Sequence, residues 1–165
     1  MPNKRKKEKN TANPINVDGY ILVPRISMGI FKIGEHIDEY KWVSDYMIYR
    51  KDIEKEWSSD SYVFKEFEGL TIYVDDYDKI ESINVDKYCC YNGIDLIGYN
   101  FKKFKELINQ EPYDEDFLPV IMIDGKNVQN QHVYEFDDLG LQVWVRYNKI
   151  ISITCSNYID ANDDV

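Results

Sequence analysis

Three segments of this chain occur twice in the same order, and this internal repeat is the strongest constraint on its fold. The matching segments are GIFKIG (29–34) with GIDLIG (93–98), GLTIYV (69–74) with GLQVWV (140–145), and KIESI (79–83) with KIISI (149–153). Self-similarity at a regular period indicates that one structural unit has been duplicated. A period of roughly 65 to 70 residues is too long for one unit of a solenoid and suits a small α+β module.

Each copy is predicted to begin with a helix. Apolar residues recur at helical spacing after Gly34 and again after Gly98, and Asn100 stands where it can cap the second helix. The positions are Ile37, Tyr40, Trp42 and Val43 in the first copy, and Phe101, Phe104, Leu107 and Ile108 in the second.

Segments rich in Val, Ile, Tyr and Phe follow each helix, and turn sequences at 75–78 and 147–148 separate some of them. These strands are expected at 62–67, 70–74 and 80–85, and at 120–123, 133–136, 141–146 and 150–155. The predicted fold class is therefore α+β: two tandem helix-plus-antiparallel-meander repeats, with the helices packed on one face of the sheet or sheets.

Charge and composition set the expected domain boundaries. With 165 residues and 44% apolar content, the chain can bury one core or two small cores that share an interface. The first ten residues carry five basic side chains and Glu8, a net charge of +4. The whole chain has a net charge of −10, so the other 155 residues together carry −14. We expect a disordered basic tail at 1–16, repeats at 17–84 and 85–156, and an acidic tail at 157–165.

The sequence predicts a cytoplasmic protein. The basic start is not followed by an apolar stretch typical of a signal peptide, and no segment approaches the length of a membrane span. Cys89, Cys90 and Cys155 are an odd number of cysteines, and two of them are adjacent, which favours a reducing compartment. Neither a membrane nor a nucleic acid is expected as a partner, because both repel an acidic surface.

Alternation along the strands predicts which side chains lie outside the core. In the first copy Leu70, Ile72 and Val74 are expected inside, with Thr71 and Tyr73 outside. Trp144 matches Tyr73 in the second copy, so two large aromatic side chains are expected among small polar residues on one sheet surface. They either pack across strands on a solvated face or anchor a protein interface. The predicted partner-binding residues are Tyr73, Trp144 and Arg146, with Asp75, Asp76, Tyr77, Asp78, Asp137 and Asp138 as an acidic rim.

The order of these motifs across nearly the whole chain resembles the β-lactamase inhibitory protein family and the related single-copy module of outer-membrane assembly lipoproteins. The resemblance implies a tandem sheet whose concave surface grips another protein through aromatic and acidic side chains. By this resemblance, Tyr73 and Trp144 would lie on that surface. The chain departs from the family in lacking a secretion signal and paired cysteines.

Small size, acidity and abundant tyrosine are also typical of bacterial toxin-immunity proteins. On this analogy the chain is expected to be a non-catalytic inhibitor that binds a basic toxin or enzyme, for example a nuclease, in a stoichiometric complex. The alternative from another class is an acidic nucleic-acid mimic that blocks a DNA-binding protein. A mimic needs rows of carboxylates, whereas an inhibitor needs an aromatic centre with charges at its edge.

An enzyme is the third and least favoured class. Asp114 or Asp116, followed by Asp124 and Lys126, has the order of a metal-dependent nuclease site, in which carboxylates hold the metal and the lysine stabilises charge. Asp124-Gly125-Lys126-Asn127 is explained more simply as a turn. No cofactor or metal is expected, since His36 and His132 have no partner at ligand spacing and the acidic turn at 75–78 lacks the length and glycine of a calcium loop.

Overall fold

The computed structural model describes residues 17–43, 47–50, 60–118 and 131–157. The predicted N-terminal tail, nearly all of the predicted C-terminal tail and the strand expected at 120–123 lie outside these ranges. The elements are η1 (Val17–Tyr20), β1 (Leu22–Val23), β2 (Ser27–Met28), β3 (Phe31–Lys32), η2 (Ile37–Tyr40), β4 (Met47–Arg50), β5 (Ser61–Val63), β6 (Leu70–Val74), β7 (Ile80–Val85), β8 (Cys90–Tyr91), β9 (Ile94–Asp95), α1 (Phe101–Ile108), β10 (Asp114–Leu118), β11 (Gln131–Phe136), η3 (Asp137–Leu139), β12 (Leu141–Arg146) and β13 (Lys149–Ser156).

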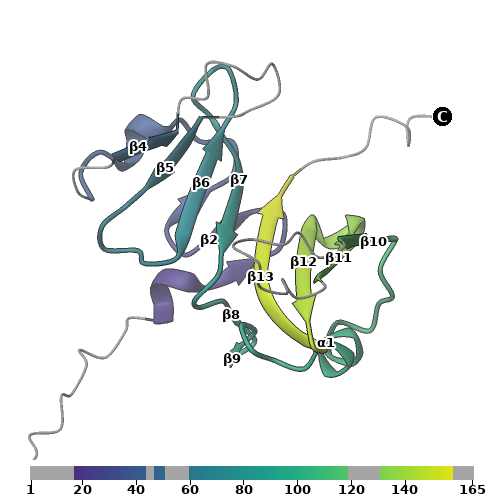
Figure 1. Cartoon of the computed structure of the whole chain (residues 1–165). Coiled ribbons are helices and arrows are strands. Elements are labelled where there is room, and N and C mark those ends of the chain that lie inside the picture. The colour runs from purple at the N-terminus through teal and green to yellow at the C-terminus, as the bar shows by residue number, and fades with distance from the viewer. Residues whose placement is uncertain (1–16, 44–46, 51–59, 119–130, 158–165) are drawn as a thin grey trace, which may run out of the picture.

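One antiparallel sheet organises the molecule. Its strand order is β10-β11-β12-β13-β7-β6-β5-β4, so two four-stranded meanders join where the last strand of each pairs with the other. Figure 1 shows β4 to β7 on one side and β10 to β13 on the other. Two small sheets, β1-β2-β3 and β8-β9, precede the meanders in the chain.

The two meanders have the same register and the same irregularity. In β6 and β7, Ile72 pairs with Ile83 and a β-bulge follows Tyr73; in β12 and β13, Val143 pairs with Ile153 and a β-bulge follows Trp144. A bulge adds one residue to one strand and bends it. Equal registers with equal bulges show that the sequence repeat corresponds to equivalent backbone geometry in this part of the chain.

Glycines mark equivalent backbone positions in both halves. The three pairs that match in sequence, Gly29 with Gly93, Gly34 with Gly98, and Gly69 with Gly140, all have positive φ. The amide of Gly34 donates to the carbonyl of Ile80 at 2.8 Å, and the amide of Gly98 donates to the carbonyl of Ile150 at 2.7 Å. Each Ile-Gly motif therefore meets the start of the last strand of its own meander in the same way.

The inner face of the sheet forms the core. Leu70, Ile72 and Val143 are at most 1% exposed, in agreement with the predicted alternation. The N-terminal part of the chain lies behind β5 to β7 in Figure 1 and buries its own apolar side chains against this face. The segment between the two meanders, which includes α1, adds to this layer. The covering residues are Tyr20, Leu22, Met28, Phe31, Ile37 and Tyr40 from the N-terminal part, and Cys89, Leu96, Phe101 and Phe104 from the segment between the meanders.

The prediction of an α+β fold with two helix-plus-meander repeats was wrong. The structure is mostly β, and α1 is the one α-helix in the described ranges, so only the second half has the expected helix. The corresponding segment of the first half is η2, a 3-10 helix of four residues. Short hairpins supply much of the layer on the inner face that the prediction assigned to helices.

Local sequence explains why only one helix forms. α1 is rich in Lys, Glu and Leu, which favour helices, and the Asn100 side chain accepts from the Lys103 amide at 3.0 Å, which confirms the predicted cap. η2 contains Asp38 and Tyr40, which favour helices less, and buries only Ile37 and Tyr40. The Tyr40 hydroxyl accepts from the Lys32 amide at 2.9 Å and donates to the Glu35 carboxylate, which ties this single turn back to β3.

Candidate protein-binding face

The outer face of the sheet carries small polar residues between two aromatic side chains. Because directly paired residues point to the same side of a sheet, Thr71, Asn84 and Thr154 share this face, and Tyr73 and Trp144 flank them. All five are half-buried, whereas the alternate residues on these strands are buried in the core. The predicted outward positions of Tyr73 and Trp144 are therefore confirmed.

Local symmetry relates the two aromatic positions. Asn84 pairs with Thr154, and the flanking pairs are Val85 with Ile153 and Ile83 with Cys155, so equivalent residues of the two halves exchange across the β7–β13 junction. A pseudo-twofold axis thus passes between Asn84 and Thr154. It places Tyr73 and Trp144 at equivalent points on opposite sides of the centre.

The two aromatic side chains are close enough to contact one partner. Three strand spacings separate β12 from β6, which is about 14 Å, and the register offsets the two residues by four positions along the strands, about 13 Å. The separation is therefore roughly 19 Å, while a standard interface of about 800 Å² per partner is roughly 30 Å across. Both anchors fit within a single protein interface.

Hydrogen bonds hold Trp144 in place. Its indole Nε1 donates to Gln142 Oε1 at 3.2 Å, and Gln142 Nε2 donates to Glu135 Oε1 at 2.7 Å. Glu135 pairs with Asp114 on the edge strand β10, so carboxylates adjoin the Trp144 side of the face. Sequence reasoning missed Gln142 and Glu135, although alternation along β12 places Gln142 beside Trp144.

The acidic turn predicted as a rim is an ordered hairpin tip next to Tyr73. The Asp75 carboxylate accepts from the amides of Tyr77 and Lys79 at 2.9 and 3.0 Å, so it shapes the turn. Asp76 and Asp78 are exposed, and Tyr77 is 78% exposed. The tip therefore presents an aromatic ring between two exposed acidic side chains.

The opposite corner of the face has different charge. Tyr147, in the β12–β13 turn, is 76% exposed and corresponds to Tyr77, but Arg146 and Asn148 stand where the first half has Asp76 and Asp78. Arg146 lies two residues beyond Trp144 and pairs with Lys149. Sequence reasoning missed Tyr147, which the matching motif Tyr-x-Lys after each strand could have identified.

The structure does not bring Asp137 and Asp138 to Trp144. They belong to η3, at the end of the sheet where β12 begins, and Trp144 is the fourth residue of that strand. Strand directions put η3 at the same end as the 75–78 tip, with β13 between the two hairpins. The backbone carbonyls of both aspartates accept from the Arg25 guanidinium, so this turn also docks the N-terminal hairpin.

The residues considered for catalysis are only partly described. Asp114 and Asp116 are exposed side chains on β10, while Asp124 and Lys126 lie outside the described residues. Where the chain is described, no group of three or more His, Cys, Asp or Glu side chains could hold a metal ion. His132 Nδ1 lies 3.2 Å from Glu115 Oε1, and His36 accepts from the Asp38 amide at the start of η2.

Comparisons with protein-family models, with curated proteins and with solved structures find no match to this chain. The resemblance to the β-lactamase inhibitory protein family therefore stays a hypothesis that rests on the sequence motifs. Among the described residues, no helix has the length and apolar composition needed to cross a membrane.

Proposed function

We propose that this chain is a non-catalytic, cytoplasmic protein-binding inhibitor, most consistent with an immunity protein that neutralises a basic toxin. The outer face of the eight-stranded sheet and the 75–78 tip would form the interface. The observation that carries the proposal is the pair of symmetry-related aromatic residues, Tyr73 and Trp144, set on a rigid sheet among small polar side chains. Aromatic anchors surrounded by polar contacts dominate the binding energy of many protein interfaces.

Charge supports a basic target. The net charge is −10, and the exposed Asp76 and Asp78 lie in the turn that follows β6, the strand of Tyr73. Such rim charges accelerate encounter with a basic protein and exclude acidic ones, while central aromatics slow dissociation. Arg146 at the other corner makes the face asymmetric in charge, which would fix the orientation of the partner.

The nucleic-acid mimic fits the outer face less well. The centre of the face is uncharged, with Asn84 and Thr154 at the symmetry axis, whereas a mimic presents carboxylates in rows. Asp114 and Asp116 do lie on one side of β10, two residues apart, but at the edge of the sheet. This arrangement favours an inhibitor with an aromatic centre and acidic margins.

The test is a binding experiment with a candidate partner, beginning with the product of a neighbouring open reading frame. Calorimetry should give a one-to-one complex, and Trp144→Ala and Tyr73→Ala should each weaken it by about 2 kcal/mol, the usual cost of a central anchor. Trp42→Ala is the matched control, because Trp42 is 76% exposed and follows η2, which packs against the inner face. Equal losses of binding free energy in Trp42→Ala and Trp144→Ala, or no loss in either Trp144→Ala or Tyr73→Ala, would contradict the proposal.

A further inference from the structure

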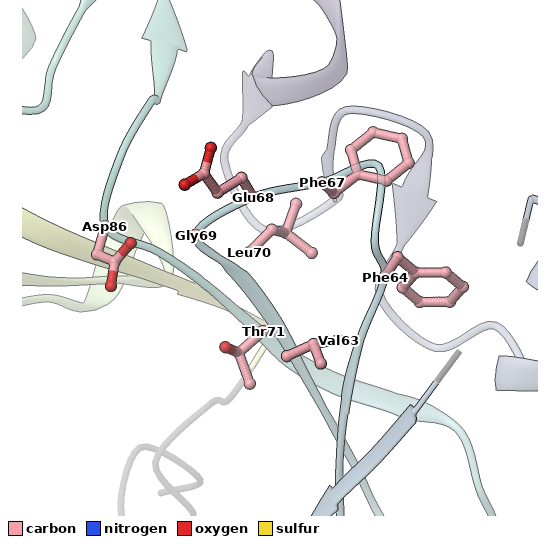
Figure 2. A pocket seen from close by; sticks show the side chains of 8 residues that line it. All are labelled: Val63, Phe64, Phe67, Glu68, Gly69, Leu70, Thr71 and Asp86. Carbon is pink, nitrogen blue, oxygen red and sulfur yellow. The ribbon is translucent and has the colours of Figure 1, made fainter. Parts of the chain in front are cut away.

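A pocket of about 330 Å³ opens at the end of the sheet where the β5–β6 turn lies. Figure 2 shows the carboxylate of Glu68 above Gly69 and that of Asp86 to its left, with Thr71 and Val63 below them. Thr71 and Val63 pair with each other on the outer face, so the pocket adjoins the face that carries Tyr73. The lining residues are Val63, Phe64, Phe67, Glu68, Gly69, Leu70, Thr71 and Asp86.

The second half of the molecule has an equivalent turn, and an arginine occupies it. The Gly69 carbonyl accepts from the Asp86 amide at 3.0 Å, and the Gly140 carbonyl accepts from the Ser156 amide at 2.8 Å, so the two turns correspond. Arg25 passes over Gly140, with its Cγ 2.8 Å from where a Cβ on that glycine would lie. Its guanidinium donates to the carbonyls of Asp137 and Asp138. This turn of the fold thus accepts an arginine side chain.

In the first half no arginine of the described chain takes this position. Asp86 and Lys87 cover Gly69 instead, with Asp86 Oδ1 2.5 Å and Lys87 Cγ 2.8 Å from the corresponding Cβ position, and the Lys87 ammonium pairs with Glu68. Asp86 has no hydrogen bond or ion pair of its side chain to a described residue, and the pocket beside it is open. The site therefore holds one exposed cation, the Lys87 ammonium, which another cation can displace from Glu68. The carboxylate of Asp86 has no described partner.

We propose that this pocket, between the β5–β6 turn and Asp86, binds an arginine side chain of the partner protein. The methylene groups would pack on Val63 and Thr71, and the guanidinium would lie between Asp86 and Glu68. Arginine suits the site better than lysine, because its planar guanidinium has donors on several sides and can bridge two carboxylates. The inference rests on the proposed function, since it gives the sheet-face interface a specific anchor on a basic target.

The pocket can be tested without the partner. The isotope-labelled full chain would be titrated with N-acetyl-arginine amide and followed by two-dimensional NMR, with N-acetyl-citrulline amide as the uncharged probe of the same shape. The arginine probe should shift the amide signals of Gly69, Thr71 and Asp86, with a dissociation constant in the millimolar range. Asp86→Asn should weaken binding about three-fold, and Lys87→Ala should strengthen it, because Lys87 competes for Glu68.

Asp76→Asn is the matched control, since it removes the same charge from an exposed aspartate at the other end of β6. Equal binding of both probes, equal effects of Asp86→Asn and Asp76→Asn, or shifts confined to other parts of the chain would overturn the arginine pocket. Failure here leaves the binding role of Tyr73 and Trp144 intact, because that role is measured on the complex. Failure of the anchors, in turn, does not alter the titration of the free chain.

Discussion

The side-chain amide of Asn84 donates a 2.8 Å hydrogen bond to the hydroxyl of Thr154, across the junction between β7 and β13. These two residues occupy equivalent positions in the two meanders, so a single polar contact lies on the pseudo-twofold axis. Two identical residues at these positions would face each other across the axis. The present pair of different side chains supplies one donor and one acceptor.

Loss of this contact should loosen the junction of the two halves. We expect Asn84→Ala to lower the free energy of unfolding by about 1 kcal/mol, since it removes the half-buried hydrogen bond to Thr154 at 2.8 Å and a longer one to the Ser152 hydroxyl at 3.5 Å. The measurement is urea denaturation of both proteins. Thr71→Ala is the control. Thr71 lies on β6, the other neighbour of β7, and pairs with Asn84 there, but it takes no part in the hydrogen bond to Thr154. Equal effects of the two substitutions would contradict a special role for the Asn84–Thr154 contact.

Two glycines of the repeat should respond very differently to alanine. Gly98 has φ +83° and nothing within 4 Å of a new Cβ, so Gly98→Ala should cost only the conformational strain, about 1 kcal/mol. Gly140 has φ +59°, and a Cβ there would lie 2.1 Å from the Ser156 carbonyl oxygen, which belongs to the backbone. Gly140→Ala should therefore cost about 3 kcal/mol or more. Thermal unfolding of both variants tests the order, and a reversed order would contradict the close approach.

Sequence predicted the meanders well because their signal is local and occurs twice. Alternating residues in 70–74 and 141–145 indicated both the strands and their faces, and the turns at 75–78 and 147–148 lie where the sequence places them. The outward positions of Tyr73 and Trp144 follow from the same alternation. Ile151 is an exception: regular alternation with Ile153 and Cys155 would place it inside, but the bulge after Trp144 makes it the extra residue, and Ile150 is buried instead.

The first helix was mispredicted because its pattern is ambiguous. Ile37, Tyr40 and Val43 are spaced by three, which a 3-10 turn satisfies as well as an α-helix does. The hairpins of the N-terminal layer were missed because strands of two residues contain no periodicity. The contact of Arg25 with η3 joins segments 112 residues apart, and no local sequence pattern predicts such a contact.

Arg25 should stabilise the β11–β12 turn from a distance in sequence. Arg25→Ala removes a charged donor from two backbone carbonyls and should cost about 1 to 2 kcal/mol, because such bonds are stronger than neutral ones. Hydrogen exchange of the Gly140 amide, which donates to the Asp137 carbonyl at 3.1 Å, should speed up in the variant. Lys65→Ala removes an exposed positive charge from the equivalent turn of the first half and serves as control. Unchanged exchange at Gly140 in Arg25→Ala would refute the docking role.

Alkylation should distinguish the three cysteines by burial. Cys89 and Cys155 are fully buried and Cys90 is half-buried. Burial raises the pKa of the Cys89 thiol and raises that of Cys155 to about 11, so neither forms the reactive thiolate at pH 8. Iodoacetamide should label Cys90 first, and the other two only as the chain unfolds. Peptide mass spectrometry measures the order, and early labelling of Cys155 would contradict the buried core.

Stability should fall at alkaline pH, and Tyr40 should account for part of the loss. Burial, followed by the hydrogen bond to the Glu35 carboxylate, raises the pKa of Tyr40 from 10.0 to about 12. A pKa that folding raises contributes stability that is complete below pH 10 and disappears as pH rises toward 12, because the unfolded chain loses this proton first. Urea midpoints between pH 9 and 12 should therefore drop less steeply in Tyr40→Phe, which cannot ionise. Tyr77→Phe provides the control at a 78% exposed tyrosine, and identical slopes for the two variants would show that Tyr40 ionises as freely as a surface residue.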